Sequence, residues 1–228
     1  MNHIIWKNKD SRTLTGLIIS ELPPITKPAM RIQETIVDGV DGSIIEELGY
    51  EAYNKSMEIG LSRNFNIDEV INYFSGEGEI VFSNEPDKYY KARIINQIDY
   101  ERLIRFRTAK VTFKVQPFKY EYQETISSVS KNQAVTNKGN YFSKPIFEIT
   151  GSGTIELIVN NNKIFSYTFP DDEDTVVIDS QKQDAYLGTV LKNRNMSGEF
   201  PVFEIGQNII TWNGTITNIK ISLKSRWL

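Results

Sequence analysis

The sequence predicts a mainly β protein, with one α-helix in its first half and a β-sandwich in its second half. Val111, Phe113 and Val115 alternate with polar residues, which is the period of a half-buried strand. About seven short strand-like segments, separated by turn residues, occupy roughly the last ninety residues, as is typical of a β-sandwich. Convincing helical spacing of apolar residues occurs only after Asn66.

The first part of the chain predicts strands joined by an extended connection and a loop. Apolar runs indicate strands at residues 4–6 and 14–19. The segment 22–28 contains three prolines, and we expect it to cross the surface without helix or ladder because proline has no backbone N–H. Residues 31–37 alternate as a strand does, and 38–49 then predict a loop too apolar to be only solvated.

Asn66 begins the predicted helix. Its side chain is suited to cap the first N–H groups, and Glu69 completes a capping box. Gly76 is expected to end the helix in a left-handed conformation. The buried stripe is predicted from residues at helical spacing, namely Ile67, Val70, Ile71 and Phe74.

An antiparallel meander is predicted over residues 79–120. Its strands are expected at 80–82, 89–94 and 111–115. Pro117 should stop the ladder, since it cannot donate a backbone hydrogen bond. We interpret the meander as the closing sheet of a first domain.

The second half begins after a polar linker at residues 123–138. Gly151-Ser152-Gly153 predicts a turn, and 160–163 predicts a hairpin turn. Asn213-Gly214 is the strongest short-range hairpin signal in the chain. With such a hairpin, Trp212 lies on the apolar face of its strand, which favours a core position over a sugar-stacking platform.

Composition excludes several kinds of chemistry. The chain has 228 residues, no cysteine and one histidine, His3, which excludes disulfides, thiolate zinc sites, iron–sulfur clusters and two-histidine metal sites. A net charge of −3 with mixed signs argues against wrapping of nucleic acid. The acidic run at 171–174 is more typical of a solvated turn than of a metal site. We expect no membrane span, no signal peptide, no cofactor and no catalytic residue.

Four segments carry a family resemblance. The runs FSNEPDKYYKARI (82–94) and VTFKVQPFKY (111–120) resemble the N-terminal domain of the distal tail protein (Dit) of siphophages infecting Gram-positive bacteria. The run GNYFSKPIFEITGSGTIELIVNNNKI (139–164) resembles the start of that family's C-terminal domain, and residues 198–228 resemble its closing strands, including the final Arg226-Trp227.

This resemblance implies a structural protein of the virion. It implies a ring-forming domain at 1–130, built as a β-sandwich with one helix and an extended hairpin. It also implies a domain at 131–228 similar to galectins or carbohydrate-binding modules. In the family, six copies form a ring that joins the tail tube protein to the tail-associated tip protein and the baseplate. The ring leaves a channel through which DNA only passes, and assembly takes place in the host cytoplasm.

The expected subunit contacts follow from the ring. A cyclic ring needs one patch that meets a different patch on the next copy. We expect Ile44 and Ile45, in the apolar loop, to lie on a neighbouring subunit, and we assign Tyr89 and Tyr90 to core and subunit contacts. The alternative function is a carbohydrate-binding or receptor-binding module that acts through the C-terminal sandwich.

Overall fold

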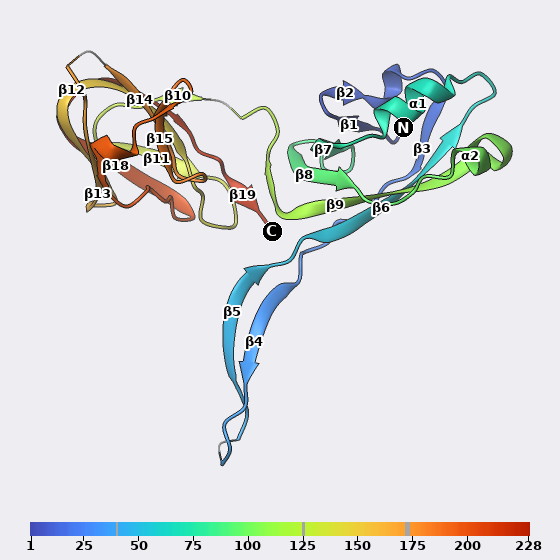
Figure 1. Ribbon diagram of the computed structural model, residues 1–228, viewed down its shortest axis with the longest axis horizontal. Coiled ribbons are helices and arrows are strands. Elements are labelled where there is room, and N and C mark those ends of the chain that lie inside the picture. The colour runs from blue at the N-terminus through green and yellow to red at the C-terminus, as the bar shows by residue number, and fades with distance from the viewer. Residues whose placement is uncertain (40, 125, 172–173) are drawn as a thin grey trace. The chain divides into compact units, whose positions relative to one another are not determined.

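The computed structural model describes residues 1–39, 41–124, 126–171 and 174–228. The chain forms two compact units: Met1–Tyr122 together with Leu228, and Gln123–Trp227 (Figure 1). Both are built mainly of strands, which confirms the predicted fold class. The units divide between Tyr122 and Gln123, and the ring-forming and galectin-like roles expected for 1–130 and 131–228 stay predictions. Among the described residues, no helix is long and apolar enough to cross a membrane.

The first unit is organised by one sheet. Its strands follow the spatial order β2 (Lys9–Asp10), β1 (Ile4–Trp6), β7 (Glu77–Phe82), β8 (Lys88–Ile94), β9 (Thr108–Glu121), β6 (Tyr53–Leu61) and β3 (Leu17–Glu21). The neighbours β7, β8 and β9 are antiparallel and consecutive in the sheet, so the predicted meander is confirmed. The predicted strand at 14–19 begins only at Leu17, because Gly16 has a φ of +80°, which an extended strand does not have.

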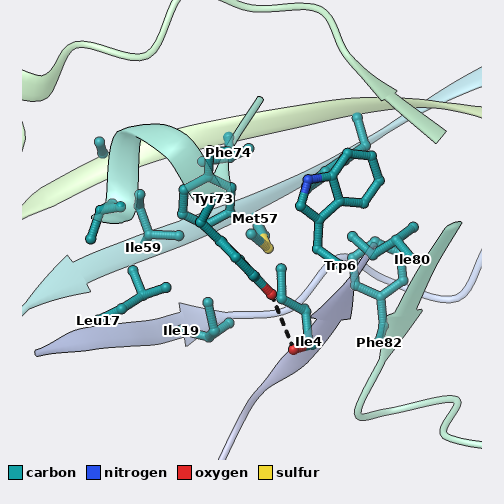
Figure 2. Close-up of a cluster of buried hydrophobic side chains, with 14 of the residues drawn as sticks. Ile4, Trp6, Leu17, Ile19, Met57, Ile59, Tyr73, Phe74, Ile80 and Phe82 are labelled. Carbon is teal, nitrogen blue, oxygen red and sulfur yellow. Dashed lines mark hydrogen bonds between the residues drawn. The ribbon is translucent and has the colours of Figure 1, made fainter. Parts of the chain in front are cut away.

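Helix α1 (Ile67–Tyr73) covers the core of the first unit. The Asn66 side chain accepts from the backbone N–H of Glu69 at 3.4 Å, as the capping pattern predicts. Figure 2 shows side chains from α1, β1, β3 and β6 converging on one cluster. The predicted stripe needs one correction: Ile71 is exposed and Tyr73 is buried, with its hydroxyl 3.3 Å from the backbone oxygen of Ile4.

Two further expectations for this unit were wrong. A second helix, α2 (Tyr100–Phe106), lies between β8 and β9, where no helix was predicted. Strand β9 also continues through Pro117. The register between β8 and β9 shifts between Tyr90 and Ala92, opposite the stretch that holds this proline. At a bulge, not every residue has to donate its backbone N–H to the neighbouring strand. Proline, which has no backbone N–H, is therefore tolerated there.

The remaining strands of the first unit form a separate two-stranded sheet. Strands β4 (Met30–Thr35) and β5 (Ile44–Tyr50) pair only with each other. In Figure 1 they extend from the unit as an arm. The loop predicted at 38–49 is therefore wrong from Ile44 onward, because those residues form a cross-strand ladder with β4.

The second unit is built on two long strands that pair with each other, β12 (Ile146–Val159) and β18 (Gly206–Ser222). Its other elements are β10 (Ser127–Ser128), β11 (Gln133–Asn137), β13 (Asn162–Thr168), β14 (Thr175–Asp179), β15 (Asp184–Leu187), β16 (Val190–Leu191), η2 (Asn193–Asn195), β17 (Met196–Gly198) and β19 (Arg226–Trp227). The predicted hairpin turn after Val159 is confirmed, since Asn160 and Asn161 both have positive φ between paired strands.

The turns predicted at 151–153 and at Asn213-Gly214 were wrong, because β12 and β18 run straight through them. A type I′ hairpin needs positive φ at both central residues. Only Gly214 has it, with φ +84°. The register between the two strands shifts between Ser152 and Glu156, opposite Gly214. The glycine therefore forms an irregularity within a continuous strand, where a Cβ would lie 2.3 Å from the backbone oxygen of Thr154.

Candidate interaction surface: the β4–β5 arm

The β4–β5 arm exposes apolar side chains that have nothing to pack against in the described chain. Ile44 and Ile45, the residues predicted to touch a neighbouring subunit, are 65% and 58% exposed. The arm also carries other exposed apolar residues at its base, strands and tip: Met30, Ile32, Ile36, Val37 and Leu48. Such a concentration on one element is typical of a surface that interacts with another protein, a membrane or a ligand.

The register divides these side chains between both faces of the arm. Ile44 pairs with Thr35, whereas Ile45 pairs with Glu34. Successive residues of a strand point to opposite faces, so Ile44 and Ile45 lie on opposite sides. A two-stranded sheet that is open on both faces is marginal in water by itself, and its outer edges leave backbone groups free for another chain.

The arm is acidic as well as apolar. Glu34, Glu46 and Glu47 lie in its strands, and no ion pair of Glu46 or Glu47 is found among the described residues. Arg31 is the one basic side chain within strands β4 and β5, and it donates to the backbone oxygen of Leu48 at 2.9 Å. A partner surface should therefore offer cations and apolar contacts together.

The base of the arm is fixed to the first unit through the proline-rich segment. Lys55 Nζ donates to the Pro24 oxygen at 2.7 Å, and the Asn84 amide donates to the Pro23 oxygen at 3.0 Å. The Tyr50 ring, at the end of β5, contacts Phe118 edge-on, with ring centroids 5.9 Å apart. The extended connection predicted at 22–28 thus carries no regular structure, but its backbone is held in place.

A buried ionic cluster lies beneath this segment. Lys119 Nζ is 2.7 Å from Glu85 Oε1, and the Tyr90 hydroxyl donates to the other oxygen of the same carboxylate. Lys55 lies over the Tyr90 ring, 5.0 Å from its centroid. Burial lowers the pKa of Lys55 to about 8, although the nearby Glu85 carboxylate opposes that shift. Burial raises the pKa of Tyr53 to about 12.

The structure separates the two tyrosines that were assigned to core and subunit contacts. Tyr90 is fully buried in the core of the first unit, so it has no surface to offer a partner in this conformation. Tyr89 is half-buried and stacks on Tyr120 at 5.4 Å between ring centroids. Ile44, Ile45 and Tyr89 are the predicted contact residues that retain an accessible surface.

Helix α2 was not predicted, although the sequence holds a local signal for it. The Asp99 carboxylate accepts from the backbone N–H of Arg102 at 2.8 Å, which is an N-cap. Leu103 is the buried residue of α2, while Ile104 and Phe106 are exposed. A single buried residue gives no repeat along the helix, so the sequence pattern does not reveal α2.

No group of three or more potential metal ligands is found among the described residues. The middle of the acidic run at 171–174 lies outside the described residues, so that prediction is not tested. Trp212 is 9% exposed and belongs to the core of the second unit, which confirms the expected core position. Its ring therefore does not form an open platform for a sugar.

The fold is similar to those of a phage hub protein and of phage baseplate proteins among solved structures. The crystal structure of SPP1 Dit, described as a paradigm of the hub adsorption apparatus in phages infecting Gram-positive bacteria, covers 100% of both chains with a TM-score of 0.73 and 13% identity. Two structures of the phage p2 baseplate in its activated conformation, with Sr and with Ca, match at TM-scores of 0.50 and 0.51. They show 11% and 10% identity over 96% and 97% of both chains.

Neither a protein-family model nor a curated protein sequence matches the chain. At 13% identity the likeness is one of fold. The chain has the Dit fold over its full length, and the predicted resemblance to distal tail proteins is confirmed at that level.

Proposed function

We propose that this protein is a structural hub of a phage tail, without catalytic activity, and that it assembles with copies of itself through the β4–β5 arm. The fold shared with SPP1 Dit over both full chains supports the hub role. The observation that carries self-association is the arm itself, with isoleucines exposed on both faces of an isolated two-stranded sheet.

In its finer form, the proposal places a hexameric ring at the distal end of the tail tube. The ring joins the tube protein to the tail-tip and host-adsorption proteins and leaves a channel through which DNA passes. Closed rings need a heterologous interface, and an arm that extends from the unit supplies one of its two surfaces. The protein is then a virion component that assembles in the host cytoplasm.

The test is the double substitution Ile44→Asp and Ile45→Asp in the full chain. Carboxylates at both positions cannot be desolvated in an apolar interface without a partner, so we expect rings in electron micrographs of the parent protein and monomers for the variant. Light scattering after size exclusion measures the mass. Because both residues are exposed, the far-UV circular dichroism should not change.

The matched control is Val190→Asp with Leu191→Asp, which alters two neighbouring exposed residues of β16 in the second unit. We expect this control to keep the parent mass. An unchanged mass for the arm variant would contradict the proposed role of the arm.

A further inference from the structure

The segment that joins strand β3 to strand β4 of the arm, residues 22–29, is held by side chains rather than by a strand ladder. Three of its residues are prolines, which have no backbone N–H to donate. Its attachment to the first unit uses backbone carbonyl oxygens instead. The Asn84 amide donates to the Pro23 oxygen at 3.0 Å, Lys55 Nζ to the Pro24 oxygen at 2.7 Å and the Tyr53 hydroxyl to the Thr26 oxygen at 3.3 Å.

Lys55 is the charged member of this set of donors. The carboxylate that acts on it, Glu85, has both oxygens taken by other groups: Lys119 Nζ lies 2.7 Å from Oε1, and the Tyr90 hydroxyl donates to Oε2. Within the part of the chain that the structure describes, the Pro24 oxygen is the one hydrogen-bond acceptor of the Lys55 amine. A hydrogen bond from an ionised donor is about twice as strong as one between neutral groups, so the segment and the buried cation stabilise each other.

The other connection of the arm to the first unit is short. Glu51 and Ala52 alone separate β5 from β6, the strand that carries Lys55. Hinges in proteins are a few residues at the ends of such elements, where the backbone dihedral angles absorb a change of direction. The arm can therefore turn about this short connection, and the bound segment at residues 22–29 limits that turn.

We propose that the Lys55 ammonium is a latch for the β4–β5 arm. While it binds the Pro24 oxygen, the arm leaves the first unit in one direction, and without that bond the arm turns about Glu51 and Ala52. Lys55 acts here as a positioning residue, since it touches the root of the arm and not the exposed isoleucines. The inference concerns a single copy of the chain and does not rest on the proposed function.

Such a latch responds to pH, because a neutral amine donates a weaker hydrogen bond than an ammonium does. The titratable groups around the amine are Glu85 between β7 and β8, Tyr90 from β8, Lys119 from β9 and Tyr53 from β6. Burial lowers the pKa of Lys55 to about 8, Glu85 raises it and Lys119 lowers it further. Burial raises the pKa of both tyrosines, so they keep their protons while Lys55 loses its own.

Distances between two spin labels test the latch, since the chain has no cysteine of its own. Ser43→Cys beside β5 and Glu69→Cys on α1, both at exposed positions, carry nitroxides in the full chain. Labelled chains are diluted with an excess of unlabelled protein, so that distances within one copy are measured by electron paramagnetic resonance. At pH 7 we expect Lys55→Met to increase the population of distances outside the parent distribution about tenfold. The matched control, Lys110→Met, should keep the parent distribution.

The second measurement needs no substitution in the core. Raising the pH from 7 to 9.5 should broaden the parent distribution toward that of Lys55→Met and leave the distribution of Lys55→Met unchanged. Far-UV circular dichroism checks that both proteins stay folded at each pH. Equal distributions for the parent and Lys55→Met at pH 7 overturn the inference, and so does a parent distribution that does not change with pH.

Discussion

At the residue scale, the most informative group is the lysine beneath the arm's base. Lys55 is 3% exposed and is surrounded by the rings of Tyr53, Phe82 and Tyr90. The charges of Glu85 and Lys119 also act on its pKa. Its pKa is lowered to about 8, chiefly by burial. Below that pH the folded protein holds a buried cation, and this costs stability unless partners compensate it.

The stability of the first unit should therefore rise with pH between about 8 and 10. In that window Lys55 is still protonated in the unfolded chain, because the ordinary pKa of a lysine is 10.5. In the folded chain Lys55 has already lost its proton. Stability rises wherever the unfolded state binds more protons. We expect the parent protein to gain up to about 2 kcal/mol relative to Lys55→Met between pH 7.5 and 9.5, measured by urea unfolding.

The upper limit of this pH window is set by tyrosine. The raised pKa of Tyr53, about 12, makes the folded state hold that proton longer than the unfolded state does, so stability falls above about pH 10. Lys110→Met, which removes an exposed lysine from β9, is the matched control. A free-energy difference between parent and Lys55→Met that stays constant with pH would contradict the buried position of the amine.

A second residue-scale prediction concerns the glycine of β18. Gly214 has φ +84°, and a Cβ at this position would lie 2.3 Å from the Thr154 oxygen, so it has neither the conformation nor the space for a side chain. We expect Gly214→Ala to cost about 3 kcal/mol or more in the urea unfolding of the second unit.

Gly153→Ala is its matched control. Gly153 also has positive φ, at +64°, but a Cβ added there would have nothing within 4 Å, so only the backbone cost of about 1 kcal/mol remains. Equal costs for the two substitutions would show that β18 does not approach β12 as described.

At the scale of elements, the arm differs from every other ladder of the first unit. Its side chains are largely exposed, whereas β1, β6 and β9 each contribute buried residues to one core. Its base is fixed by hydrogen bonds to the proline-rich segment and by the backbone bond from Glu51 to Ala29. The arm therefore adds little to the stability of the unit, and its side chains stay accessible.

Excision of the arm should separate folding from assembly. We expect replacement of residues 31–49 by a short Gly-Ser turn to change the free energy of unfolding of the first unit by no more than about 0.5 kcal/mol, because no core residue is removed. The same change should leave the protein monomeric by light scattering.

The control deletes only residues 38–42, which lie between β4 and β5 in the sequence. The paired strands with Ile44 and Ile45 remain, and association should persist. A large loss of stability on excision of residues 31–49 would mean that the arm is part of the folding unit.

At the scale of the whole molecule, the chain has two separate cores. One is built from β1, β3, β6, β7, β8, β9 and the two α-helices, and the other from the long strands β12 and β18 with their neighbours. Each compact unit buries its own apolar cluster. A unit with a hydrophobic core of its own can in principle fold by itself.

Two cores predict two unfolding transitions. Phe147→Ala, at a fully buried position of the second unit, should destabilise that unit by about 3–5 kcal/mol and leave amide-exchange protection in the first unit unchanged. Phe113→Ala, fully buried in the first unit, is the reciprocal variant. Loss of protection throughout the chain with either substitution would indicate one cooperative unit instead.

Periodicity located the elements wherever a long apolar face decides the structure. The alternation at Val111, Phe113 and Val115 predicted β9, and Asn66 with its following stripe predicted α1. The pattern failed at short or locally ambiguous signals. Asn213-Gly214 has the composition of a hairpin, but pairing with β12 on both sides of Gly214 outweighs the local preference for a turn.

The candidate surface was predictable only in part. Ile44 and Ile45 were identified because an apolar loop needs cover, and both are exposed. Tyr90 was assigned to core and subunit contacts, and it lies in the core, where its hydroxyl donates to Glu85, a partner that the sequence does not reveal. Helix α2 was not predicted, because a seven-residue helix carries too few turns for a pattern.

The sequence by itself determined the mainly β class, the absence of cysteine chemistry, the capped helix and the resemblance to distal tail proteins, since each depends on residue type and spacing along the chain. Only the tertiary structure decided which apolar residues stay uncovered, which charges are buried together and whether Gly214 turns the chain or bends a strand. Those outcomes depend on pairing between segments far apart in sequence, and the free energy of that long-range pairing exceeds the local preferences that a sequence pattern records.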